Sequence, residues 1–244
     1  MRHIALISDI HGNLTALDAV LADIDAARIG ERYCLGDLVG YGPDPKGVVD
    51  RMRASGIPTV LGNYDEGIGL RRGDCGCYYA TPLARSDGEA GYAFTEAQID
   101  DDRAAWLAGL PHELRFTHGG RRALLVHGSP RKVNEYLLPD RTDEQLVRLA
   151  KAADADIVCV GHVHMPYHRV LAGSDGTRID YVSVGSVGKP KDGDPRACWT
   201  ELTLGDEGSV DADFHRVAYD IETVAAKMRA AGLPDTLITA LRDA

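Results

Sequence analysis

The sequence predicts a mixed α/β (α+β) fold in which two packed sheets are covered by helices on their outer sides. In the first part of the chain, short apolar strands alternate with loops and helices, which is typical of a mainly parallel sheet covered by helices. After residues 157–160 the pattern changes to successive strands separated by turns that contain Gly and Asp. Because 244 residues can form one large domain and no linker interrupts them, we expect a single domain over residues 1–244.

Strand and helix signals divide the first part of the chain. Residues 3–7 form an apolar strand, and Asn13 can cap a helix in which Leu and Ile recur at helical spacing. A second strand at 33–35 leads into a Gly- and Pro-rich loop and then into a helix at 45–53, which begins with Pro. The apolar run at 57–61 predicts a third strand.

The segment 66–94 interrupts this alternation, because it is rich in Gly, Tyr and charged residues and shows no clear period. A long irregular segment in a compact domain is usually functional, so we expect an irregular active-site loop at about 66–94. Thr95 and Gln98 form a capping-box pattern, which predicts a helix that reaches about Leu107.

The remaining elements are mainly strands. A hairpin around Gly119 and Gly120 and a helix at 143–152 precede the strand at 157–160. The other predicted strands are 112–117, 122–126, 167–171, 178–184, 196–204 and 209–217, and the predicted closing helices are 221–231 and a short one after Pro234.

Composition and charge exclude several classes of protein. The chain has 44% hydrophobic and 26% charged residues, as ordinary soluble proteins do. No run of 18 apolar residues and no apolar leader occurs, so we expect no membrane partner and a cytoplasmic location. The net charge is −10 and Lys and Arg do not cluster, which argues against a nucleic-acid polymer as partner. A homo-oligomer remains open.

Five cysteines without regular spacing argue against a disulfide scaffold. Cys75 and Cys77 are unusual because only Gly76 separates them, within the irregular segment. Two thiols at this spacing could bind a soft metal or be oxidised. The favoured interpretation is two loop thiols without a role.

Polar side chains that can bind metals follow five predicted strands. The motifs are Asp9-Ile10-His11, Gly36-Asp37, Gly62-Asn63, His127-Gly128 and Gly161-His162-Val163-His164. Carboxylates and imidazoles bind divalent Mn, Fe, Zn or Co, and one carboxylate can bridge two ions. Each motif alone is most often a turn or a satisfied polar residue. Five of them in order, each after a predicted strand, indicate a site for two metals.

This series of motifs resembles the calcineurin-like metallophosphoesterase superfamily, from residue 4 to about residue 188. The absence of large insertions is similar to its small prokaryotic phosphodiesterase branch. The resemblance implies a four-layer αββα sandwich of two mixed sheets. It also implies two divalent ions (Mn, Fe, Zn, Ni or Co, with Mn favoured). One would be held by Asp9, His11, Asp37 and His164, and the other by Asn63, His127 and His162, with Asp37 bridging.

The third motif departs from the family pattern. In much of the family it reads Gly-Asn-His-Asp, and the histidine protonates the leaving group, whereas this chain has Tyr64. A phenol, with a pKa near 10, is a weaker acid than imidazole at neutral pH. Asp65 orients that histidine in the family, and Tyr64 leaves this role open. Arg131 could bind the phosphate oxygens of the substrate, or it could pair with Glu135 in a solvated loop.

The resemblance implies a metal-dependent hydrolase of phosphate esters that uses a hydroxide bridging the two metals. A phosphodiesterase or phosphatase acting on small nucleotide-like substrates is the favoured interpretation. Dinucleoside-polyphosphate hydrolysis and protein dephosphorylation use the same kind of metal centre and are the alternatives. A catalytically weak interaction scaffold is a remote alternative, because all seven expected ligands are present.

Overall fold

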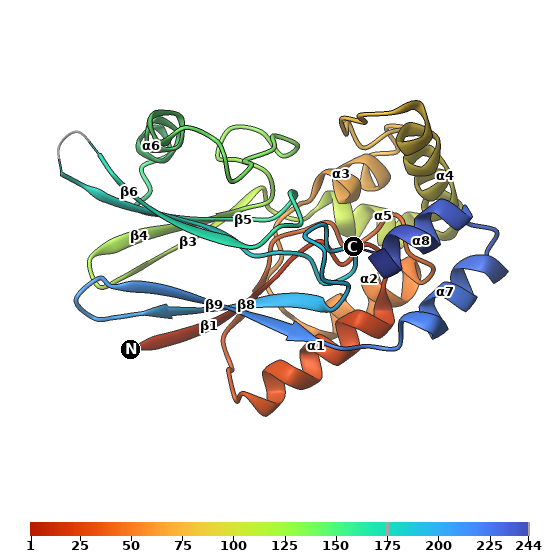
Figure 1. The fold of residues 1–244 in the computed structure, drawn as a ribbon, viewed down its shortest axis with the longest axis horizontal. Coiled ribbons are helices and arrows are strands. Elements are labelled where there is room, and N and C mark those ends of the chain that lie inside the picture. Colours follow the sequence, from red (N-terminus) through yellow and green to blue (C-terminus); the bar gives the residue numbers. More distant parts are fainter. Residues whose placement is uncertain (174–175, 244) are drawn as a thin grey trace.

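Two β-sheets pack face to face in the computed structural model, which describes residues 1–173 and 176–243 (Figure 1). The four-stranded sheet has the order β2-β1-β8-β9 and consists of β1 (Arg2–Ile7), β2 (Arg32–Cys34), β8 (Ala197–Leu204) and β9 (Val210–Val217). The five-stranded sheet has the order β3-β4-β5-β7-β6 and consists of β3 (Glu113–His118), β4 (Arg121–Val126), β5 (Ile157–Val160), β6 (Tyr167–Ala172) and β7 (Arg178–Ser183). Both sheets contain parallel and antiparallel pairs, which confirms the predicted αββα sandwich of mixed sheets.

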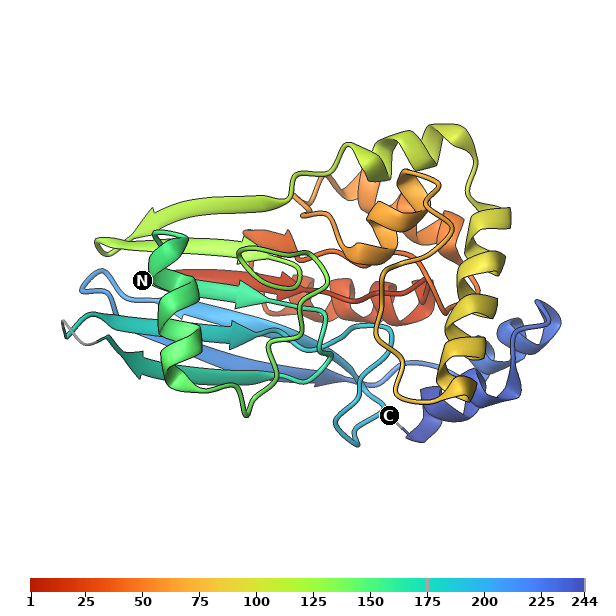
Figure 2. The same cartoon turned by 90° about the horizontal axis from the view of Figure 1, so that it is seen from above.

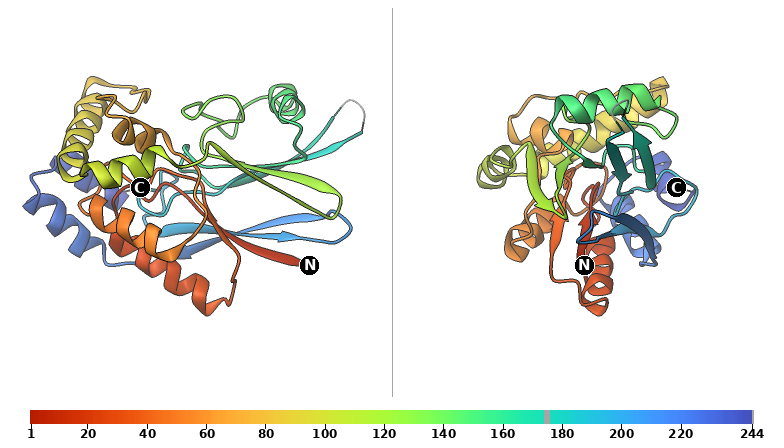
Figure 3. Two further views of the ribbon diagram at one scale, coloured as in Figure 1. Left: turned by 180° about the vertical axis from the view of Figure 1, so that it is seen from behind. Right: turned by 90° about the vertical axis from the view of Figure 1, so that its left-hand side faces the viewer.

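The helices cover the outer faces and one end of the sheets. They are α1 (Leu14–Ala26), α2 (Pro45–Ser55), α3 (Asn63–Gly69), α4 (Pro82–Gln98), α5 (Asp101–Ala108), α6 (Asp143–Ala152), α7 (Ile221–Ala230) and α8 (Asp235–Asp243). Figure 3 shows α1 and α6 on opposite outer sides of the paired sheets. The helices α3, α4, α5, α7 and α8 lie together at one end (Figure 2). No helix in the described part of the chain is long and apolar enough to cross a bilayer.

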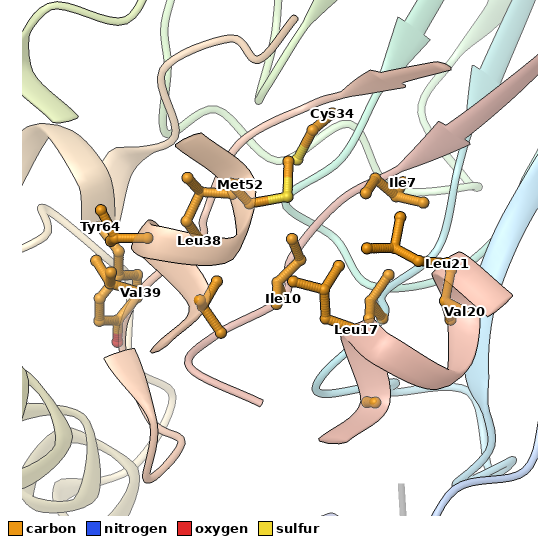
Figure 4. Packing of buried hydrophobic residues seen from close by; sticks show 14 of the residues in the cluster. Ile7, Ile10, Leu17, Val20, Leu21, Cys34, Leu38, Val39, Met52 and Tyr64 are labelled. Atoms are coloured by element: carbon orange, nitrogen blue, oxygen red, sulfur yellow. The ribbon is translucent and has the colours of Figure 1, made fainter. Parts of the chain in front are cut away.

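Alternate side chains of β1 contribute to two different layers of the hydrophobic core. Ile4 and Leu6 pack between the two sheets, whereas Ala5 and Ile7 point to the other face. That other face belongs to the largest apolar cluster, which fills the space between the four-stranded sheet and its helices and includes Tyr64 (Figure 4). A third cluster lies between α6 and the outer face of the five-stranded sheet.

The parallel pairing of strands brings the predicted motifs to one edge. β1 runs parallel to β2, and β4, β5 and β7 run parallel to one another. The loops that follow these five strands therefore leave the sheets at the end where most helices lie (Figure 1).

The predicted strand at 57–61 is wrong in its extent. The segment forms one isolated parallel bridge between Thr59 and Cys34. Pro58 accepts a hydrogen bond from the backbone N–H of Cys34 (3.0 Å) but has no N–H of its own to extend the ladder. Asn63 consequently begins a helix, α3, directly after this short extended segment.

The segment 66–94 is more regular than its composition predicts, because the end of α3 and most of α4 lie in it and only 70–81 lies between these helices. Thr81 caps α4, and its hydroxyl accepts the backbone N–H of Ala84 (3.1 Å). The predicted cap at Thr95 is wrong, since Thr95 lies inside α4 and donates to the carbonyl of Gly91. Asp100 caps α5 instead.

Two glycines explain why α4 was not predicted. Gly88 and Gly91 lower the helix propensity of this segment. A Cβ atom at Gly91 would lie 3.2 Å from the Cα of Tyr41, and one at Gly88 would lie 2.3 Å from the Tyr79 hydroxyl. These glycines therefore allow close packing of the helix rather than a flexible loop.

Candidate metal centre

Six of the seven predicted ligands form two buried clusters beyond the strand ends. The first cluster is Asp9, His11 and His164, and the second is Asp37, His127 and His162. Within each cluster the candidate ligand atoms lie within 4.8 Å of one another. Asn63, the seventh predicted ligand, joins the second cluster, with its Oδ1 3.1 Å from Nε2 of His127.

Asp37 lies between the two clusters. Its Oδ2 is 3.3 Å from Nε2 of His127 in the second cluster and 3.7 Å from Nε2 of His11 in the first. Its Oδ1 accepts the backbone N–H of Tyr64 (2.9 Å). One oxygen is thus fixed by the protein while the other faces both clusters, as a bridging carboxylate requires.

Backbone carbonyls fix the orientation of three histidines. The contacts run from Nδ1 of His11 to Val39 (3.0 Å), from Nδ1 of His127 to Leu35 (2.7 Å) and from Nδ1 of His164 to Lys189 (2.5 Å). Because a carbonyl oxygen only accepts, Nδ1 of each ring must carry the proton. The Nε2 atoms are then directed into the clusters, where each can bind a metal once it carries no proton.

Burial keeps most of these histidines neutral. It lowers the pKa of His11 and His162 to about 3, and, with Lys191 and Lys189 nearby, it holds the pKa of His164 well below its usual value. Neutral imidazole is the form that binds metals, so these rings need not lose a proton at neutral pH.

Asp37 and His127 form a charged pair instead. Burial alone would raise the pKa of Asp37, but the His127, His11 and His162 imidazoles outweigh it and hold that pKa below its usual value. Burial disfavours charge on His127 too, yet Asp37 raises the pKa of His127 to about 9. The buried carboxylates therefore attract positive charge, which a divalent cation would supply.

Among the buried side-chain atoms that have no hydrogen-bond partner within residues 1–173 and 176–243, two belong to predicted metal ligands. They are Oδ1 of Asp9 and Nε2 of His162. The other oxygen of Asp9 accepts the backbone N–H of His162 (3.0 Å). A buried acceptor without a partner costs about 1–3 kcal/mol. Cations in the two clusters would satisfy both atoms, so the donor set fits divalent metals that accept N and O ligands.

The backbone at the site is strained at the ligands themselves. The five with φ in the left-handed region are Asp9 (53°), His11 (48°), Asp37 (53°), His162 (66°) and His164 (61°). Such conformations cost about 1–3 kcal/mol each and concentrate at functional sites. Two glycines allow the loops to approach, since a Cβ at Gly62 would lie 2.1 Å from the Asp37 nitrogen and one at Gly161 would lie 2.1 Å from the Ser8 hydroxyl.

Asp65 holds the Asp37 loop. Its carboxylate accepts the backbone N–H groups of Leu38 (2.9 Å), Val39 (3.4 Å) and Gly62 (3.1 Å). Burial and the Asp37 carboxylate raise the pKa of Asp65 to about 7. This geometry makes Asp65 a positioning residue that joins the second and third motif loops.

Tyr64 lies beside the first cluster, in the apolar core. Its ring meets the edge of the His11 ring (centroids 5.3 Å apart, 84° between planes) and is 2% exposed. Its hydroxyl is buried and has no hydrogen-bond partner among the described residues. Burial, with the phenols of Tyr41 and Tyr79, raises the pKa of Tyr64 above its usual value, so the phenol stays protonated.

Arg131 lies at the surface and pairs with Glu135 (2.5 Å), which also binds Arg141 (2.6 Å). The Arg131–Glu135 ion pair in a solvated loop, one of the two alternatives that the sequence left open, is therefore present. Arg131 also lines a cavity of about 260 Å³ together with His127.

Cys75 and Cys77 are joined by a disulfide in the segment between α3 and α4, so they are not the two free thiols that the sequence favoured. The Asn63 amide nitrogen donates to the carbonyl of Cys75 (2.9 Å) and contacts Sγ of Cys77 (3.1 Å). Because the amide nitrogen faces this segment, Oδ1 of Asn63 faces the second cluster.

Sequence reasoning missed Lys189 and Lys191. They lie on the loop after β7, and burial lowers the pKa of Lys189 to about 8, with repulsion from Lys191 adding to it. The available signal was their position directly after the glycine-containing turn at 185–188, which follows a strand.

The αββα sandwich carries two Asp/His clusters beyond its strand ends, each of which could hold a metal ion, and this combination defines the class of protein. The sequence profile of the calcineurin-like phosphoesterase superfamily domain matches residues 1–204, and the chain belongs to that superfamily.

Three similar proteins bear on this site. An uncharacterized protein of Methanocaldococcus jannaschii is 32% identical over 246 residues, which cover 96% of this chain and 95% of that protein. The crystal structure of a metallophosphoesterase from Sphaerobacter thermophilus is 33% identical, covers 99% of each chain and superposes with a TM-score of 0.75. A symmetrical bis(5'-nucleosyl)-tetraphosphatase of an Acidovorax species is 30% identical over 152 residues, which cover 61% of this chain and 49% of that protein.

Proposed function

We propose that this chain is a phosphoesterase that uses two divalent metal ions to hydrolyse small, nucleotide-like phosphate esters. The observation that supports the proposal best is the position of Asp37, whose Oδ2 faces a histidine of each cluster. A superfamily member that had become a scaffold would have no need to keep seven ligand side chains converging on one edge.

The two metal positions follow from the clusters. Asp9, His11, Asp37 and His164 would hold one ion, and Asn63, His127, His162 and Asp37 would hold the other. When bound, the ions would lower the pKa of a water molecule and withdraw charge from the phosphoryl group. The ligand types accept Mn, Fe, Zn, Ni or Co, and we favour Mn.

The protein's own groups prepare the site for this chemistry. Neutral, buried histidines present their lone pairs without first losing a proton. Asp65 holds the Asp37 loop in place. Tyr64, which packs against His11, is the candidate proton donor to the leaving group. Because burial raises the pKa of Tyr64, proton donation is weak, and substrates with good leaving groups are favoured.

Metal analysis combined with an activity assay tests the proposal. Two divalent ions per chain and hydrolysis of bis-p-nitrophenyl phosphate are expected, with activity lost on chelation and restored by Mn. One ion per chain, or no hydrolysis of activated diesters and monoesters by the protein with both metals bound, would refute it.

A dinucleoside-polyphosphate hydrolase is the second candidate. The similarity to the Acidovorax tetraphosphatase favours it. A phosphate leaving group also needs little protonation, which suits a site where Tyr64 replaces the usual histidine. A higher kcat/KM for diadenosine tetraphosphate than for nucleotide diesters would select this candidate. A cytoplasmic location and the oligomeric state remain predictions.

A further inference from the structure

The loop that follows β7 is hydrogen-bonded to the loops that carry the first cluster. Backbone N–H groups of Val187 and Gly188 donate to the carbonyls of Ser8 (2.9 Å) and Asp9 (3.0 Å). The Ser186 hydroxyl also donates to the carbonyl of Asp9 (2.7 Å). The position of this loop relative to the first cluster is therefore fixed by the protein backbone.

Two lysines on this loop flank His164. The carbonyl of Lys189 accepts Nδ1–H of His164 (2.5 Å), and the backbone N–H of Lys191 donates to the carbonyl of His164 (3.3 Å). A ligand histidine and two cationic side chains are thus held together by main-chain contacts, which do not depend on the lysine side chains.

The ammonium group of Lys189 lies beside the first cluster. It is 4.7 Å from the centroid of the Tyr41 ring, and the Tyr41 ring meets the edge of the His11 ring (centroids 5.0 Å apart). Lys189, Tyr41 and His11 line a small cavity of about 20 Å³. Apolar side chains of α7 and α8, Val224, Met228, Leu237 and Leu241, close its other side. Because apolar side chains line this cavity, water screens the charge of the Lys189 ammonium group only weakly.

Neither ammonium group has a carboxylate or hydrogen-bond partner in the described part of the chain. By contrast, Lys227 on α7 pairs with Asp44 (2.9 Å). Lys189 is partly buried and Lys191 is exposed. The contact with Tyr41 accounts for the direction of the Lys189 side chain, but an aromatic ring does not satisfy three N–H donors. Asp87 attracts the Lys189 ammonium group, and Asp9 and Asp37 attract that of Lys191. None of these carboxylates is at hydrogen-bond distance, so both ammonium groups can still bind an anion directly.

We propose that Lys189 and Lys191 bind phosphate oxygens of the substrate at the first metal position, an inference that rests on the proposed function. Two added positive charges favour a substrate that carries more than one negative charge at or next to the reacting phosphorus. The substrate class is then a phosphomonoester dianion or a polyphosphate, rather than a simple monoanionic diester. In a polyphosphate the second charge comes from the neighbouring phosphate.

Binding of inorganic phosphate to the Mn-loaded protein, measured by calorimetry, tests this directly. Lys189→Met keeps most of the unbranched side chain and the carbonyl that holds His164, so metal content should stay at two per chain. Phosphate affinity should fall about tenfold to hundredfold, as for loss of a charge-assisted hydrogen bond. Lys189→Arg should recover most of it, and Lys191→Met should add to the loss in the double variant. The matched control is Lys151→Met, which changes an exposed lysine on α6, the helix on the outer face of the five-stranded sheet. This variant should bind phosphate as the wild type does.

Kinetics then identify the source of the second charge. The KM of Lys189→Met should rise more for p-nitrophenyl phosphate or for inorganic pyrophosphate than for bis-p-nitrophenyl phosphate. A larger loss on the monoester assigns the lysines to the reacting phosphate, and a larger loss on pyrophosphate assigns them to its neighbour; both support the inference. Unchanged phosphate affinity in the double variant, equal loss on all three substrates, or loss of metal in proportion to loss of phosphate would overturn it. If the wild type bound phosphate through these lysines but hydrolysed none of the esters, the proposed function would fail while the anion site remained.

Discussion

The two carboxylate oxygens of Asp37 make different contacts. Oδ1 accepts the backbone N–H of Tyr64, and Oδ2 faces His11 and His127. The charge of Asp37 also raises the pKa of His127 to about 9. Without a metal, His127 therefore carries a proton at the position where a metal cation would bind. The charge of His127 therefore depends most strongly on Asp37, with Asp9 adding to it.

Asp37→Asn should reduce kcat by at least about 100-fold, while the fold is retained. The amide keeps the shape and can still accept from Tyr64, but it removes the negative charge shared by the two metal positions. Elemental analysis should find fewer than two metals per chain, and far-UV circular dichroism should match the wild type. Near wild-type turnover with both metals bound would rule out the bridging role.

Tyr64 is the residue at which this chain departs from the usual motif. Substitution Tyr64→His should increase activity on alkyl esters more than on nitrophenyl esters, because imidazole is a stronger acid at neutral pH. General acid catalysis is typically worth about 10²–10⁴-fold, so the gain should be measurable.

Tyr64→Phe is the complementary variant. A loss confined to alkyl esters would identify the phenol as the working acid, an equal loss on both esters would indicate positioning, and no loss would make the ring a wall of the core. Because the Tyr64 hydroxyl has no partner within the described residues, Tyr64→Phe should not lower stability.

At the scale of elements, strands and their end motifs could be predicted because their signals are local. β1 and β5 are short apolar runs that end in polar motifs, and both lie within a residue or two of the predicted positions. Helix α4 could not be predicted, because glycine normally weakens a helix. The reason for Gly88 and Gly91 is their close packing against Tyr79 and Tyr41, which only the folded structure reveals. The resemblance names Asp65 as a site residue. Its role in holding the Asp37 loop could not be predicted, because its three backbone partners lie on two loops.

Asp65→Asn tests the connection between these loops. An amide offers one acceptor oxygen in place of two, and its NH₂ group would face backbone N–H donors. Metal affinity should fall about tenfold to hundredfold, with a loss of about 1–3 kcal/mol in the free energy of unfolding. The matched control is Glu66→Gln, the next residue on α3, whose carboxylate pairs with Arg72 at the surface and should not affect metal binding. Wild-type metal affinity in Asp65→Asn would show that the loops hold their positions without it.

At the scale of the whole molecule, the order of strands in the sheets could not be predicted from the periodicity of the sequence. β8 comes late in the chain yet pairs with β1, and β7 inserts between β5 and β6. The sequence patterns supply strands but not their partners, so the four-layer arrangement rested on the resemblance of the motifs. The two metal clusters likewise depend on pairings that join residues as far apart as His11 and His164.

A buried ion-pair network near the opposite end of the sheets joins several strands and both sheets. Asp180 on β7 is fully buried and accepts hydrogen bonds from Arg121 (2.6 Å), Arg178 (2.9 Å) and His168 (2.8 Å). Arg121 also donates to the carbonyl of Gly208, in the turn of the other sheet (3.2 Å). Burial alone would raise the pKa of Asp180, but these three partners outweigh it and hold the pKa below its usual value.

Asp180→Asn should lower the free energy of unfolding by about 1–3 kcal/mol at pH 7, because it removes the charged acceptor of Arg121, whose side chain is only 12% exposed. The folded-state pKa of Asp180 lies below the unfolded value of about 3.9, so the charged form stabilises the fold above that pH and the contribution is lost as the pH falls below it. Urea unfolding at several pH values should therefore show a constant difference between wild type and variant from pH 7 to about 5, which shrinks below about pH 4. The same change at exposed Asp211 on β9 should alter stability by no more than about 0.5 kcal/mol. A difference that grew toward acid pH, or none at pH 7, would mean that Asp180 is not held as a carboxylate and that the network does not connect the two sheets energetically.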